Sequence, residues 1–206
     1  MGETEAQRPR RYKHVFLDAE GTLYVPKHNR SRWEFWADPN PEAAVEFFEL
    51  DRGVREALAR LREQVDTLCV VSKNTDAILG ALLEKFGIGD CFDNIMLNGN
   101  KGKLIEEYLL SHGLRKEDSL MVGDMPVLDL YPVKKVGVDS ILVDREYNRW
   151  ARAERIRGIF ELPAWLKIAD MAERGVGRRA RNSTLDEFPA GASADCTKSL
   201  IAVPGV

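Results

Sequence analysis

The stretch HVFLDAEGTL, residues 14–23, decides the fold of this chain. Its apolar part, residues 15–17, has the composition of a buried strand, which we expect to end at Asp18. Asp18 and Glu20 then place two carboxylates just before a glycine turn. Carboxylates removed from water repel each other and need a cation or a proton. The pattern favours a metal-binding, nucleophilic loop at the end of a central strand, and a solvent-exposed acidic turn is the alternative that this stretch leaves open.

Length and composition are those of a single globular domain. The chain has 206 residues, of which 44% are hydrophobic and 31% charged, with a net charge of −3. This charge creates no field that attracts nucleic acid, so we expect no nucleic-acid partner. We also expect no membrane partner, because no apolar run approaches the roughly 20 residues that cross a bilayer. Three cysteines without metal-ligand spacing predict free thiols in a reducing compartment, and hence a cytoplasmic protein.

After the first strand, apolar segments of strand and helix character alternate. The pattern predicts further strands at 67–72, 92–97, 119–122 and 140–143. It predicts helices at 51–64, 76–86, 101–112 and 127–136, the last distorted by Pro132, and a final helix or strand-like edge at 162–171. Such alternation indicates an α/β fold, a Rossmann-like parallel sheet with helices on both faces.

The domain organisation follows from the same pattern. We expect a flexible lead-in over 1–13, one domain over 14–175 and a disordered tail over 176–206. A small aromatic-rich insert occupies 24–50, where Asn40 and Pro41 predict the start of a short helix. We expect its aromatic rings to pack on the core, with a small lid over the active site as the alternative.

Polar residues that carry chemistry recur where the predicted strands end. Besides Asp18, they are Ser72, Lys101 in a glycine-rich turn, and Asp124 with Asp129 five residues later. The carboxyl ends of parallel strands converge on one crevice, so these groups are expected to share a site. Carboxylates such as Asp18 and Asp124 are ligands that suit Mg²⁺. A lysine and a hydroxyl beside them would hold a phosphoryl group.

Four motifs in order give this sequence a family resemblance. They are HVFLDAEGTL, LCVVSKN, NGNKGKLI and LMVGDMPVLD, followed by SILVDR. Together they resemble the motifs of the haloacid dehalogenase superfamily over about residues 12–145. The resemblance implies a fold of that type without a large cap domain. It also implies a Mg²⁺-dependent phosphatase, because most members hydrolyse phosphate esters.

The resemblance also implies a role for each matching residue. Asp18 would attack phosphorus and form an aspartyl-phosphate, and Glu20 would act as general acid and then base. Mg²⁺ would bind Asp18, the backbone carbonyl of Glu20 and Asp124, with Asp129 supporting this shell. The residues implied in holding the substrate phosphate are Ser72, Lys73, Asn74 and Lys101.

Several alternatives remain open at this point. Phosphatases of the family normally have aspartate where Glu20 stands, so turnover is reduced or the site is reshaped. Lys103 is an alternative to Lys101 as the motif lysine, and the sequence NKG before an apolar helix favours Lys101. The second class of function is a catalytically reduced binding or scaffold protein. The substrate class is a phosphorylated small molecule or a phosphoprotein. A homo-oligomer, in which a neighbouring subunit closes the site, is a further alternative.

Overall fold

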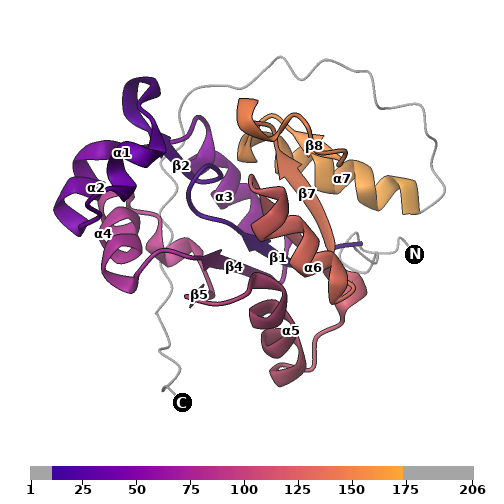
Figure 1. Ribbon diagram of the computed structural model, residues 1–206. Coiled ribbons are helices and arrows are strands. Elements are labelled where there is room, and N and C mark those ends of the chain that lie inside the picture. Colours follow the sequence, from indigo (N-terminus) through magenta and orange to yellow (C-terminus); the bar gives the residue numbers. More distant parts are fainter. Residues whose placement is uncertain (1–10, 174–206) are drawn as a thin grey trace.

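A computed structural model describes residues 11–173 of the chain (Figure 1). Its main sheet has six parallel strands in the order β5-β4-β1-β6-β7-β8. The strands are β1 His14–Leu17, β4 Thr67–Ser72, β5 Asn94–Leu97, β6 Ser119–Gly123, β7 Asp139–Val143 and β8 Arg155–Ile156. The strand order reverses beside β1, because the chain builds one side of the sheet before the other. The predicted α/β fold with a parallel sheet is therefore confirmed.

Helices cover both faces of this sheet (Figure 1). On β1, Val15 and Leu17 face one core cluster and Phe16 faces the other, as the two-residue period of a strand requires. The first cluster includes side chains of α3 Val54–Gln64, α4 Asp76–Phe86 and α7 Leu162–Glu173. The second includes side chains of α5 Lys101–Ser111 and α6 Tyr131–Lys135. A sheet buried on both faces holds β1 rigidly, and with it the residues that follow β1.

Several element boundaries differ from those predicted. The helix expected from residue 51 begins at Val54, and the strand expected from residue 92 begins at Asn94. The distorted helix expected over 127–136 is present: a π-helix at Pro126–Leu130 runs directly into α6, and Pro132 is the second residue of α6. Residues 162–171 belong to a helix rather than an edge strand. The two-residue strand β8 was not predicted.

The insert at 24–50 folds into a small unit on top of the sheet. Strands β2 Tyr24–Pro26 and β3 Phe48–Leu50 pair antiparallel and enclose helices α1 Arg32–Trp36 and α2 Pro41–Phe47. Asn40 caps α2 by accepting a hydrogen bond from Ala43 N at 2.8 Å, as predicted. Phe35, Phe47 and Phe48 are buried against the core. Between the strands of the described chain, no larger segment forms a separate cap domain.

Only part of the predicted lead-in and tail lies within the described residues. Tyr12, assigned to the lead-in from the sequence, is buried and stacks on Trp165 of α7 with ring centroids 5.8 Å apart. Residues 1–10 and the predicted tail at 176–206 lie outside the described range. Among the helices of residues 11–173, none is both long and apolar enough to cross a membrane.

Candidate active site

Asp18 stands at the carboxyl end of the central strand. Its backbone N–H donates to Val122 O at 2.9 Å, which continues the β1–β6 ladder one residue past β1. The side chain is buried, so it is presented from a fixed backbone position. This place, beside the reversal of strand order, is where ligands bind in open parallel sheets.

A tight turn follows Asp18 and brings the chain back over the site. Leu23 N donates to Ala19 O and Gly21 N donates to Tyr24 O, both at 2.7 Å. Gly21 has φ +79°, and a Cβ at this position would lie 2.3 Å from an Asp124 carboxylate oxygen. Glycine is therefore required here for backbone conformation and for space.

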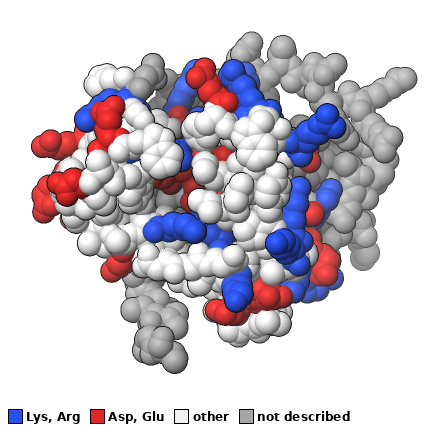
Figure 2. All heavy atoms as spheres, in the orientation of Figure 1, with Lys and Arg blue, Asp and Glu red and all other residues white. Residues whose placement is uncertain are grey.

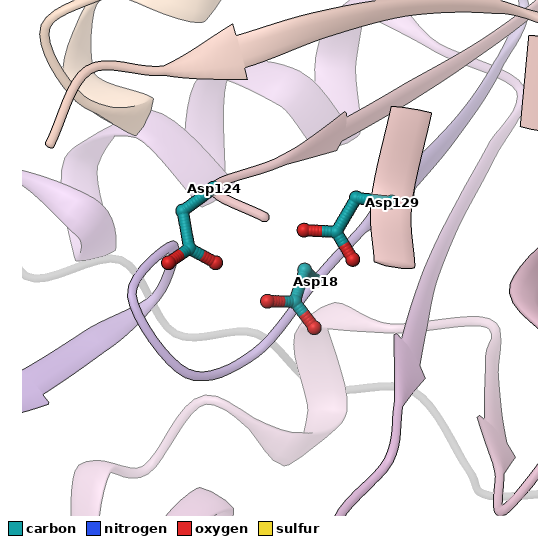
Figure 3. Close-up of side chains that lie close together, drawn as sticks. All are labelled: Asp18, Asp124 and Asp129. Atoms are coloured by element: carbon teal, nitrogen blue, oxygen red, sulfur yellow. The ribbon is translucent and has the colours of Figure 1, made fainter. Parts of the chain in front are cut away.

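Three aspartates form a buried acidic cluster. Carboxylate oxygens of Asp18, Asp124 and Asp129 lie within 4.8 Å of one another, and Figure 3 shows the three groups close together where β1 and β6 end. Asp124 Oδ1 is buried without a hydrogen-bond partner. An orphaned carboxylate oxygen in such a cluster fits a hard divalent cation that prefers oxygen ligands, such as Mg²⁺.

Lys101 is the cation that contacts Asp18 and Asp129 of this cluster. As the first residue of α5, it sends its buried ammonium to Asp18 Oδ1 and, at 2.6 Å, to Asp129 Oδ1. Asn100 caps the helix by accepting from Lys103 N at 3.2 Å, which fixes where the helix starts. Lys103 itself is exposed. Of the two lysines that the sequence left open, Lys101 is the one in the site.

Burial dominates the acid–base properties of the cluster. It raises the pKa of Asp18 and that of Asp129 to about 6, against the opposing charge of Lys101. Burial also raises the pKa of Asp124. The pKa of Lys101 rises above its usual value, because the two carboxylates outweigh the effect of its own burial. The negative charge is thus only partly neutralised by the protein's own cations.

Helix α1 of the insert holds the Glu20 carboxylate. Trp36 Nε1 donates to Glu20 Oε2 at 3.1 Å, and Arg32 Nε lies 3.4 Å from Oε1. Trp36 and Arg32 are one helical turn apart, so a hydrogen bond holds Oε2, while Oε1 has the ion pair with Arg32 but no hydrogen-bond partner. Burial raises the pKa of Glu20 to about 7, and Arg32 opposes this rise. A carboxyl group with this pKa can both donate and accept a proton near neutral pH.

The same arginine and a tyrosine orient Asp124. Arg32 Nη2 lies 3.1 Å from Asp124 Oδ2, and the Tyr147 hydroxyl donates to that oxygen. Asn148 donates to the backbone carbonyl of Asp124 at 2.7 Å. Because Arg32 and Tyr147 bind Oδ2, Oδ1 is the Asp124 oxygen left to bind a cation at the acidic cluster. None of these partners was predicted from the sequence, because they belong to no motif and come together only through the fold of the insert and the turn after β7.

The three residues after β4 have separate surroundings. Ser72 is buried at the end of β4, and its hydroxyl accepts from Asn74 N at 3.1 Å. Asn74 is buried and donates to the Tyr24 hydroxyl of the insert. Lys73 is exposed and lines a cavity of about 450 Å³ together with Lys101. Lys73 therefore lies beside the cavity that Lys101 lines, whereas the side chain of Asn74 is bonded to the Tyr24 hydroxyl of the insert.

A larger cavity opens beside Gly21. Its volume is about 970 Å³, and its walls come from the insert, from the π-helix after β6 and from the turn after β7. Arg145 lies at its base, donating to Gly21 O at 2.8 Å and pairing with Asp51. The cavity borders the acidic cluster through Arg32 and Tyr147, which line it and contact Asp124, and its space is much larger than a phosphate group.

Comparison with known proteins agrees with this geometry. Residues 19–143 match the family described as haloacid dehalogenase-like hydrolase, beginning directly after Asp18. The match covers more than half of the chain, and the fold is a six-strand parallel sheet with flanking helices. The chain belongs to the haloacid dehalogenase-like hydrolase family.

Individual relatives are distant. A glyceraldehyde 3-phosphate phosphatase of Pyrococcus furiosus is 23% identical over 145 residues, which are 64% of this chain and 58% of the relative. Among solved structures, a haloacid dehalogenase-like family hydrolase from Xanthomonas campestris has a TM-score of 0.62 at 17% identity, covering 81% of this chain and 99% of that one. A phosphatase of the family from Thermococcus onnurineus has a TM-score of 0.61 at 17% identity, with coverages of 75% and 97%. These structural likenesses establish the fold.

Proposed function

We propose that this protein is a Mg²⁺-dependent phosphatase that hydrolyses a phosphate monoester through an aspartyl-phosphate. The observation that carries the proposal is Asp18, a buried carboxylate at the end of β1 that contacts Lys101 and faces Asp124 and Asp129. The phosphatase from Pyrococcus furiosus supports the same class of reaction. The substrate remains a phosphorylated small molecule or a phosphoprotein.

Each residue of the cluster has its own role in the proposed reaction. Asp18, Asp124 and the Glu20 carbonyl would hold Mg²⁺, which would offset the negative charge of an incoming phosphate. Asp129 holds Lys101 in place, and its other oxygen accepts from Met125 N at 2.7 Å. Lys101 would hold a phosphoryl oxygen through its ammonium. Other contacts to the phosphoryl oxygens are proposed for Ser72, Lys73 and Asn74.

The reaction then proceeds in two balanced steps. An Asp18 oxygen attacks phosphorus in line, the bond from phosphorus to the ester oxygen breaks, and Glu20 gives its proton to the leaving oxygen. Water next attacks phosphorus, Glu20 takes a proton from it, and the bond between Asp18 and phosphorus breaks. Inorganic phosphate is released, and both carboxyl groups return to their starting states.

Metal binding should be visible as thermal stabilisation. Mg²⁺ at about 100 times its Kd adds about 2.7 kcal/mol to the free energy of unfolding, or roughly 5–10 °C in Tm for a chain of this size. The increase should be larger at higher pH. Because burial raises the carboxylate pKa values, the metal-free fold loses stability as pH rises from about 4 through about 6.

The measurement is a melting curve with Mg²⁺ or with EDTA, in the natural protein and in Asp124→Asn. The variant keeps the shape of the side chain but loses the charge of a proposed ligand, so its increase in Tm should be much smaller. Equal midpoints with and without metal in the natural protein would contradict a metal site.

Glu20→Gln should slow turnover by roughly 10²–10⁴-fold, because an amide cannot donate the proton. In the natural protein kcat/KM should fall as pH rises through about 7, where Glu20 loses that proton. This alkaline fall should vanish in the variant. Steady-state kinetics across pH checks both effects, and an unchanged kcat in Glu20→Gln would show that another group is the proton donor.

Trp36→Phe should lower kcat by roughly 10-fold and leave KM nearly unchanged, since it removes one of the donors that position the acid rather than a contact to substrate. Trp165→Phe is the matched control, because Trp165 also donates to a glutamate, Glu154, at 3.0 Å but far from the site. Equal kinetics in the two variants would mean that the bond to Glu20 does not position the acid.

A further inference from the structure

Exposed aromatic side chains gather around the cavity of about 970 Å³ beside the site. Eight large hydrophobic side chains of the described residues are exposed, and four of them line this one cavity: Trp33, Val127, Tyr147 and Trp150. Trp33 is 74% exposed and Trp150 is 64% exposed. An indole ring exposed to water lacks the free energy that its burial would contribute. A cluster of exposed hydrophobic side chains therefore indicates a binding surface.

The aromatic rings stand on two separate walls of the cavity. Trp33 belongs to α1 of the insert, whereas Tyr147 and Trp150 follow β7. Trp150 is fixed by its indole N–H, which donates to Tyr147 O at 3.0 Å. Figure 2 shows acidic atoms near the centre of one face, set back between largely uncharged surfaces. A molecule whose phosphate lies on the acidic cluster would extend between these walls.

One planar group already stacks on an aromatic ring in this cavity. The Arg32 guanidinium lies over the Tyr147 ring, 4.5 Å from its centroid. Aromatic rings favour flat partners, which they contact over a whole face, and such pairs gain more than their buried area alone provides. An aromatic ring of this cavity thus already takes a flat partner.

We propose that the leaving group of the substrate is a planar aromatic ring, so that the substrate is an aryl phosphate monoester. This inference rests on the proposed phosphatase function and adds the class of the leaving group. The phosphate occupies the acidic cluster with its metal, and the ring extends past Gly21 into the cavity, between Trp33 and Trp150. A small alkyl phosphate fills the phosphate site and leaves the aromatic walls in contact with water.

Binding of three phosphonates tests the proposal without any turnover. Phenylphosphonate, cyclohexylphosphonate and methylphosphonate share a headgroup whose carbon–phosphorus bond a phosphatase leaves intact, and the first two differ mainly in planarity. Isothermal titration calorimetry on the full chain with Mg²⁺ should give phenylphosphonate a Kd roughly 3- to 10-fold lower than that of cyclohexylphosphonate. Methylphosphonate should bind more weakly than either.

Variants connect this preference to the named rings. Trp33→Ala and Trp150→Ala should each reduce the phenyl-to-cyclohexyl preference by roughly 3-fold or more, whereas Leu110→Ala, which removes an exposed side chain of α5 away from the cavity, should retain it. Equal binding of all three phosphonates, or a preference that both tryptophan variants retain, overturns the proposal and leaves the phosphatase function standing. Failure of every phosphonate to bind contradicts the phosphate site itself.

Discussion

Asp18→Asn is expected to lower kcat by at least about 10³-fold while the protein stays folded. The amide keeps the shape of the side chain but is a far weaker nucleophile than a carboxylate. Folding should not suffer, because burial raises the pKa of Asp18 to about 6 and the charged form is therefore disfavoured there. Lys101 also keeps its bond to Asp129 in the variant.

The measurements are steady-state kinetics on an aryl phosphate and a melting curve. Asp118→Asn is the matched control, since Asp118 is also a buried aspartate but pairs with Arg115, outside the site. The control should lose some stability and keep its kcat. Near-normal turnover in Asp18→Asn would remove this carboxylate from the chemistry.

Lys101→Met should reduce both activity and stability. The Lys101 side chain is 3% exposed, and Asp18 and Asp129 share its ammonium. Removing one partner of a buried ion cluster costs about 3–5 kcal/mol in the free energy of unfolding, because the remaining charges are left uncompensated. Without Lys101 the two carboxylate pKa values rise further, so the loss of stability should be larger at about pH 8 than at about pH 5.

Lys103→Met is the control that the chain itself offers. It is two residues away on the same helix and exposed, so it should leave turnover and the denaturation midpoint nearly unchanged. Urea denaturation of both variants at two pH values, together with kcat and KM, separates the two lysines. Equal losses in Lys101→Met and Lys103→Met would contradict the assignment of Lys101 to the site.

The convergence of the acidic residues was predictable because it depends on topology. Asp18 and Asp124 follow strands that the apolar pattern marks clearly, and parallel strands bring their carboxyl ends to one edge of the sheet. The choice between Lys101 and Lys103 needed the structure, because it depends on the residue at which α5 begins. Asn100 determines that start, and residue spacing alone does not resolve a shift of two positions along the chain.

The insert was the least predictable part of the site. Its aromatic residues suggested core packing, which Phe35 and Phe48 confirm, yet Trp36 contacts Glu20 and Trp33 lines the open cavity. Short helices in an insert are positioned by tertiary contacts rather than by their own periodicity. Tyr147 was missed for a related reason, since tertiary bonds hold its turn, among them the one from Arg155 of β8 to Asn148 Oδ1 at 2.8 Å.

Trapping the covalent intermediate tests the central claim, nucleophilic attack by Asp18, most directly. The protein is mixed with an aryl phosphate labelled with radioactive phosphorus and Mg²⁺, quenched in acid, digested and analysed by mass spectrometry. We predict label on the peptide that contains Asp18, and hydroxylamine should remove that label, as it does from an acyl phosphate. Glu20→Gln should carry more label, because hydrolysis of the intermediate lacks its base, and Asp18→Asn should carry none. Label on any other residue, or turnover without protein-bound label in Glu20→Gln, would contradict the account.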